Sequence, residues 1–152
     1  MMIKADMHIH SYNSDGTYSF DTIIEKAKES HTQIVSITDH NCLKAYDDLS
    51  YKEDDVQIIV GVELDCVWQG IYLHVLGYGI DLEKPDFHQF VEKNNEKLEQ
   101  VNFELLKKVM KDHPECSLED YNEYIYDHKK GGWKLLHYFV DRGLSESIWD
   151  SF

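Results

Sequence analysis

The first 80 residues contain four short apolar segments, and each carries or precedes histidine and carboxylate side chains. In the first segment, residues 3–10, polar and apolar positions alternate, which places Asp6, His8 and His10 on one face of a β-strand. The other segments lie at residues 33–38, 56–62 and 70–79. This repetition is the strongest constraint on the fold, because it predicts a β-sheet that gathers ligand-type side chains at one edge.

A helix between the first two segments indicates that the strands pair in parallel. Ser19 is a suitable N-cap, and the apolar positions 20, 23, 24 and 27 follow helical spacing. The order strand, helix, strand favours an α/β fold, as a barrel or as layers. The strand ends would then share the edge at which α/β barrels place their active sites.

Further candidate groups follow or lie within the later segments. His40 follows the second segment, while Glu63 and Asp65 lie on one face at the end of the third. A carboxylate at the end of an apolar strand needs a cation or a paired base to offset its desolvation. Each group also has an ordinary interpretation, such as a turn former for Asp15 or a core histidine for His74. Their recurrence on four successive strands favours a common site.

From residue 85 onwards the pattern changes to helical spacing. Phenylalanine, leucine and valine recur at three- and four-residue steps, which predicts a helix of about 28 residues that ends by Pro114. Further helices are predicted at residues 117–127, at 133–142 and from 145 to the C-terminus.

The charge balance excludes some classes of partner. The chain has 29 acidic and 15 basic side chains, a net charge of −14, which argues against binding long nucleic acid through its phosphates. No apolar run approaches the ~18 residues of a membrane helix, and no signal peptide is recognisable. The three cysteines show no CxxC spacing, which favours free thiols over a disulfide framework or a zinc ribbon. We therefore expect a cytoplasmic domain without a membrane partner.

The motifs together resemble those of the PHP (polymerase and histidinol phosphatase) family of phosphoesterases, most closely the bacterial members that act on small nucleotides or short oligonucleotides. The segments that carry the resemblance are Asp6-x-His8-x-His10, Ser14-Asp15-Gly16, Ile37-Thr38-Asp39-His40, Gly61-Val62-Glu63 and His74-Val-Leu-Gly77-Tyr78. The resemblance implies an α/β fold in which residues 1–81 form about four strands of a distorted seven-stranded β/α barrel. Residues 82–152 resemble, more loosely, a helical insertion of the family, and the rest of the barrel is absent.

The resemblance also implies up to three divalent metal ions, zinc, manganese or iron, and a phosphoesterase reaction. The implied ligands are His8 and His10 for one ion, His74 for a second, Glu63 as a bridge between these two, and Asp15 and His40 for a third. Asp6, Asp39 and Asp65 would support these ligands from the outer shell. A metal-activated hydroxide would then attack the phosphate ester of a phosphorylated small molecule or a short oligonucleotide.

The chain also departs from the family. Its remaining histidines other than His31 fall in the helical region, including the one later Asp-x-His, Asp86-Phe87-His88, and a complete α/β barrel needs about 250 residues. Each metal would therefore lack one protein ligand. Three explanations stay open: a truncated chain of a longer enzyme, a homodimer in which a second copy completes the open sheet edge, or a non-catalytic metal-binding remnant. His137 and Asp141 could chelate across one helical turn, but we interpret them as helix-surface residues.

Overall fold

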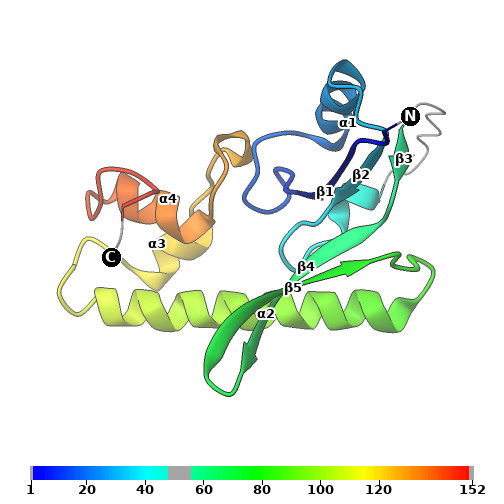
Figure 1. Cartoon of the computed structure of the whole chain (residues 1–152). Helices are drawn as coiled ribbons and strands as arrows, with labels where there is room; N and C mark the ends of the chain where they lie inside the picture. The colour runs from blue at the N-terminus through cyan, green and yellow to red at the C-terminus, as the bar shows by residue number, and fades with distance from the viewer. Residues whose placement is uncertain (1, 48–55, 151–152) are drawn as a thin grey trace.

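The computed structural model describes residues 2–47 and 56–150. The strands and helix α1 lie in the first part of the chain, and helices make up the second part (Figure 1). The strands are β1 (Ala5–Ile9), β2 (Ile34–Ile37), β3 (Gln57–Ile58), β4 (Gly61–Trp68) and β5 (Ile71–Tyr78). The helices are α1 (Phe20–Glu29), α2 (Pro85–Val109), α3 (Leu118–Glu123) and α4 (Lys134–Asp141), with 3-10 turns η1 (Lys44–Tyr46) and η2 (His128–Lys130).

The parallel sheet predicted from the sequence is present. Strands β1, β2 and β3 pair in parallel in that order, and α1 is the crossover between the first two. Ser19 caps α1 as expected, because its side chain accepts a hydrogen bond from the N–H of Thr22. Ile23, Ile24 and Ala27 of this helix are buried. The α/β class is therefore confirmed.

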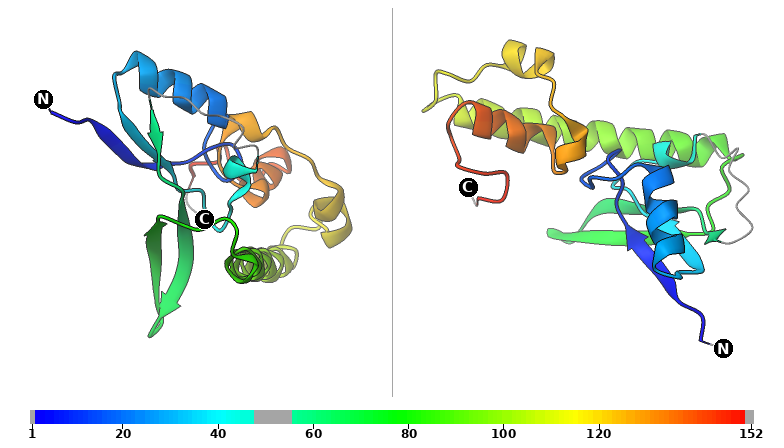
Figure 2. Two further views of the ribbon diagram at one scale, coloured as in Figure 1. Left: turned by 90° about the vertical axis from the view of Figure 1, so that its right-hand side faces the viewer. Right: turned by 90° about the horizontal axis from the view of Figure 1, so that it is seen from above.

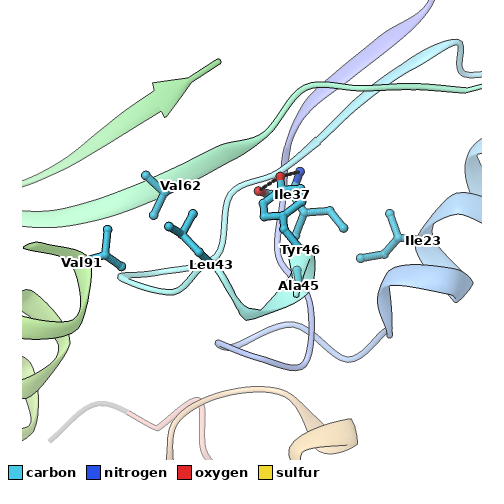
Figure 3. Packing of buried hydrophobic residues seen from close by; sticks show 7 residues of the cluster. All are labelled: Ile23, Ile37, Leu43, Ala45, Tyr46, Val62 and Val91. Atoms are coloured by element: carbon cyan, nitrogen blue, oxygen red, sulfur yellow. Dashed lines mark hydrogen bonds between the residues drawn. The ribbon is translucent and has the colours of Figure 1, made fainter. Parts of the chain in front are cut away.

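The third predicted strand is interrupted by a tyrosine side chain. The Tyr46 hydroxyl accepts hydrogen bonds from the N–H groups of Ile37 and Gly61, both at 3.0 Å, and donates to the Ile37 carbonyl. The hydroxyl thus bridges the backbone at the end of β2 and at the start of β4. Figure 3 shows its hydrogen bonds to Ile37. Strands β3 and β4 are consequently separate elements, and β4 extends to Trp68, six residues past the predicted end.

The fourth predicted strand, β5, runs antiparallel to β4. Gln69 and Gly70 have φ values of 49° and 78°, which is the conformation of a tight two-residue hairpin turn, and they reverse the chain between β4 and β5. The expectation that four strands deliver their polar groups from the same end is therefore wrong for β5. His74 instead lies in the middle of this strand, directly opposite Asp65 of β4.

Helix α2 runs along most of the length of the molecule, with the sheet beside its first part and α3 and α4 beside its second (Figures 1 and 2). Val91 of α2 belongs to a core cluster with Val62, Leu43 and Ile37 (Figure 3). Leu106, in the last turn of α2, belongs to a separate core cluster under α3 and α4, whose other buried members are Cys116, Tyr121, Leu135, Tyr138 and Phe139.

Two helix predictions need correction. The predicted helix 117–127 begins at its expected cap, Ser117, but ends at Glu123. The Asp127 side chain accepts a hydrogen bond from the N–H of Lys129 and so begins a new turn, η2, instead of continuing the helix. The helix expected from Ser145 is not formed by residues 145–150, where the Asp150 carboxylate accepts a bond from the N–H of Ser147; residues 151 and 152 lie outside the described part.

Among the described residues, no helix is both long enough and apolar enough to cross a membrane. Cys42, Cys66 and Cys116 are free thiols.

Replacement of Tyr46 by phenylalanine tests the interruption of the ladder. The variant leaves the buried N–H groups of Ile37 and Gly61 without their shared acceptor, and each unsatisfied group costs about 1–3 kcal/mol. We expect Tyr46→Phe to lower the free energy of unfolding in urea by about 1–3 kcal/mol or more. Tyr18→Phe, at an exposed ring, is the control and should change it little; equal stability of the two variants would contradict this reading.

Candidate metal centre

Four imidazoles and a buried carboxylate converge beside the sheet. His8 and His10 come from the end of β1 and the residue after it, and His40 follows β2. His40 and Glu63 form an isolated parallel bridge, which continues the sheet from β2 to β4. His74 arrives from β5. The convergence predicted from the sequence is therefore present in the structure.

The Glu63 carboxylate lies at the centre of this cluster and is only 2% exposed. Its Oε2 atom lies 2.8 Å from His8 Nε2 and 3.0 Å from His10 Nε2. His74 Nδ1 approaches the other oxygen, Oε1, at 2.7 Å, and His40 Nε2 lies 3.7 Å from Oε2. One carboxylate thus contacts imidazoles from three different strand regions on both of its oxygens.

A second group surrounds Asp15. His10 Nδ1 lies 2.9 Å from Asp15 Oδ1, yet the two atoms are not aligned as a hydrogen bond and His10 Nδ1 is buried without a hydrogen-bond partner. The imidazole of His10 also packs against those of His8 and His40, with ring centres 5.1 and 4.8 Å apart. His10 therefore faces two carboxylates, one through each ring nitrogen.

The described residues contain three groups of histidines and carboxylates that could each hold a metal ion. Within each group, the ligand atoms all lie within 4.8 Å of one another. They share members, and every metal ligand expected from the sequence belongs to at least one: His8, His10 and Glu63; His10, Asp15 and His40; His40, Glu63 and His74.

Asp39 fixes the backbone of the loop that carries Asp15. Its buried carboxylate accepts hydrogen bonds from Ser11 N, Ser11 Oγ and Ser14 Oγ, at 2.7, 2.6 and 2.6 Å. Gly16 closes the loop so tightly that a Cβ atom there would meet the His10 carbonyl oxygen at 2.0 Å. Only glycine fits this close approach, so the Ser14-Asp15-Gly16 turn has a steric reason.

Asp65 orients His40 and is itself held by two asparagines. Its Oδ1 atom lies 3.1 Å from His40 Nδ1, and its Oδ2 accepts a bond from Asn41 Nδ2. Asn94, on α2, donates to both Asn41 Oδ1 and the Asp65 carbonyl, at 2.5 and 2.9 Å. The Tyr72 hydroxyl also donates to Asp65, at 2.7 Å.

Sequence reasoning missed both asparagines, because a single asparagine carries no spacing signal. The one local signal was the position of Asn41 directly after Thr38-Asp39-His40, since asparagine tolerates the left-handed backbone region that Asn41 adopts with φ 45°. Asp6, the remaining expected support, is exposed and accepts a 3.4 Å hydrogen bond from the N–H of His8.

Two neighbouring residues before α4, Gly132 and Trp133, also contact the site. The N–H of Gly132 donates to the Asp15 carbonyl at 2.8 Å, and the Trp133 ring packs edge-on against the His40 imidazole, with centres 5.3 Å apart. His137 and Asp141 each have another partner, as expected for helix-surface residues: His137 Nε2 contacts the Gly131 carbonyl, and Asp141 accepts a hydrogen bond from the Tyr124 hydroxyl.

Opposing effects set the protonation of the cluster. Burial raises the pKa of the Glu63 carboxyl group, but the His8 hydrogen bond and the nearby imidazole charges outweigh it and hold this pKa below its usual value. Burial likewise raises the pKa of Asp15, but the interactions with His10 outweigh burial and leave this pKa lowered. For His40, burial lowers the pKa, but the hydrogen bond and charge of Asp65 outweigh burial and leave the pKa raised.

Comparison with known proteins supports a common origin. A model of the family described as PHP domain matches residues 6–144. The 5'-3' exoribonuclease Rnm of Salmonella typhimurium is 29% identical over 96 residues, 60% of this chain and 33% of that protein. The 3',5'-nucleoside bisphosphate phosphatase of Chromobacterium violaceum is 28% identical over 86 residues, which cover 55% of this chain and 30% of that protein. The chain thus spans about a third of the length of these curated relatives.

The fold is also shared with a solved structure. An amidohydrolase from Chromobacterium violaceum superposes with a TM-score of 0.73 at 18% identity, over 95% of this chain and 52% of the other. The likeness therefore extends through the helical region as well as the sheet.

The role of Asp39 can be tested by Asp39→Asn. The amide would place N–H hydrogens toward donors that now bond to a carboxylate, and a buried unsatisfied donor costs about 1–3 kcal/mol. We expect a loss of this size in the free energy of unfolding, measured by chemical denaturation. The exposed Asp112→Asn serves as control, and a loss no larger than in this control would show that Asp39 does not hold the loop.

Proposed function

This chain belongs to the PHP domain family, and from that membership we propose that it hydrolyses phosphate esters with the help of divalent metal ions, alone or as part of a longer protein. The observation that carries the proposal is the contact of four imidazoles with one buried carboxylate, Glu63. Such a concentration of neutral nitrogen and anionic oxygen donors is the usual environment of zinc, manganese or iron.

The donor set fits metal ions in its spacing. Ligands about 2.0–2.1 Å from a tetrahedral zinc ion lie roughly 3.3 Å from one another. The nitrogen–oxygen distances from Glu63 to its four imidazoles, 2.7 to 3.7 Å, bracket this value. The buried, unpaired His10 Nδ1 beside Asp15 is a second indication, because a metal would supply its missing partner.

We assign the ligands as the resemblance implies. His8 and His10 would hold one ion, His74 a second, Glu63 would bridge these two, and Asp15 and His40 would hold a third. The first ion would then have three protein ligands, as catalytic zinc sites do when they keep a position open for water or substrate, and each of the other two would have two.

The surrounding residues prepare these ligands. The bond from Asp65 to His40 Nδ1 would leave Nε2 for a metal, and Asp39 would keep Asp15 in place. Bound divalent ions would lower the pKa of a water molecule and neutralise charge on the phosphoryl oxygens. Asp6, whose carboxylate bonds to the backbone of His8, would steady the end of β1.

We propose a phosphorylated small molecule or a short oligonucleotide as substrate, in line with the nucleotide and RNA substrates named for the relatives. We also propose that residues 1–81 are part of a distorted seven-stranded barrel and that residues 82–152 are an insertion into it. A cytoplasmic location stays a prediction from the sequence.

A non-catalytic, oligomerising metal-binding module is the second candidate. Within the described residues β5 pairs only with β4, so its outer edge is open, and the hairpin exposes Val67, Trp68, Ile71 and Tyr72 by 57–70%. Open apolar edges favour association. Light scattering with metal analysis separates the two candidates. The non-catalytic module predicts a metal-loaded homodimer that does not hydrolyse phosphate esters.

Removal of His8 tests the proposed activity. We expect His8→Ala to lower the Mn²⁺- or Zn²⁺-dependent hydrolysis of nitrophenyl phosphate by more than about 100-fold, since even outer partners of a metal site contribute 10–100-fold. His113→Ala, where the imidazole contacts surface Glu115, should keep the wild-type rate. Equal rates for wild type and His8→Ala would refute catalysis at this site.

Metal binding should also depend on pH. Protons compete with metals for imidazole nitrogens, so affinity should fall as pH decreases through about 6.5. Because Asp65 raises the pKa of His40, that imidazole takes up its proton at higher pH than a free histidine, and the loss of affinity should begin earlier. Calorimetric titration with Zn²⁺ between about pH 8 and pH 5 measures this; a constant affinity would contradict a histidine-rich site.

A further inference from the structure

A pocket of about 400 Å³ opens directly beside the metal centre. One wall consists of site residues, including His40, His74 and Asp65. The opposite wall is apolar and comes from the helical segment: Leu98 and Leu105 of α2, and Trp133, Leu135 and Leu136 at the start of α4. The pocket thus joins the polar ligand cluster to an apolar surface from another part of the chain.

Two aromatic rings of the lining contact imidazoles of the site. Trp133 packs edge-on against His40, with ring centres 5.3 Å apart, and Tyr72 packs edge-on against His74 at 5.1 Å. A flat group that entered the pocket would therefore lie close to aromatic side chains as well as to both imidazoles. Pockets of this kind bind mainly through apolar and aromatic contact, with a few polar groups that set orientation.

The charges at the pocket limit what it can accept. Its described lining contains no lysine or arginine, but it contains the carboxylates of Asp15 and Asp65. The lining therefore offers no cationic side chain to bind a second phosphate, whereas an uncharged ring needs none. Asn102 adds a neutral amide that can donate to or accept from the polar edge of a heterocycle.

Resting on the function proposed above, we infer that this pocket receives an uncharged planar ring on the alcohol side of the substrate. The preferred substrate would be a phosphate monoester with an aromatic or heteroaromatic ring close to the phosphate. Trp133 and Leu98 would then determine specificity, while the imidazoles and Glu63 would hold the metal ions that bind the phosphate. An aryl ester and a nucleoside monophosphate share this chemistry.

The test compares esters that differ in the ring. For wild type with Mn²⁺, kcat/KM should be about tenfold higher for 2-phenylethyl phosphate than for butyl phosphate, the size of one stacking contact. Uridine 5'-monophosphate distinguishes a nucleobase from a simple aryl group as the natural ring. Trp133→Ala and Leu98→Ala should reduce the ratio of phenylethyl to butyl ester toward one, and Trp133→Phe should retain most of it.

Trp68→Ala, at the exposed hairpin tip, is the matched control and should keep the wild-type ratio. Equal kcat/KM for the two esters in wild type, or an unchanged ratio in both pocket variants, would overturn the inference. A second measurement needs no turnover: binding of uridine and 2-phenylethanol to the metal-free chain, followed by NMR, should weaken in Leu98→Ala.

The two proposals fail in different ways. If no ester is hydrolysed, the proposed phosphoesterase activity fails, and ring binding alone decides the pocket. If esters are hydrolysed without regard to the ring and neither alcohol binds, the activity stands and the pocket assignment fails.

Discussion

The burial of the Glu63 carboxylate is the constraint on which the rest of the structure depends. A carboxylate that is 2% exposed needs compensation for its lost hydration, and here the compensation comes from imidazoles rather than from lysine or arginine. Because those imidazoles lie on separate strands, they can reach Glu63 only if β1, β2 and the β4–β5 hairpin are joined in one arrangement. The polar cluster and the sheet geometry therefore specify each other.

Two further carboxylates, Asp39 and Asp65, support the site in different ways. Asp39 binds serine donors and so fixes a backbone, whereas Asp65 binds an imidazole and so fixes a ring. Asn94, on α2, donates a hydrogen bond to the Asp65 backbone carbonyl, and the N–H of Gly132 donates to the Asp15 carbonyl. The helical segment thus contributes to the order of the site through hydrogen bonds, although the sequence presents it as a separate region without chemistry of its own.

Local pattern was enough to predict much of this arrangement. The alternation around His8 and the Ser19 cap predicted β1 and α1, and apolar runs predicted the other strands, because those signals are carried by neighbouring residues. What could not be predicted depends on distant partners. Nothing near residue 60 indicates that the Tyr46 hydroxyl enters the ladder, and nothing near Asn94 indicates that it faces Asp65. The antiparallel direction of β5 differs from these features, because the Gln69-Gly70 turn is a local signal from which it could have been predicted.

The proposed function also accounts for how so acidic a chain could act on an anion. The candidate site gathers the carboxylates of Glu63, Asp15, Asp39 and Asp65, and a site with this charge would repel a phosphate. Divalent ions at the site would reverse that field, since bound metals are usually the largest local charges where they occur. Substrate affinity would then depend on metal loading by simple linkage, and the chain would need few arginines, of which it has one. The same carboxylates that disfavour a free anion would thus favour the metals that make its binding possible.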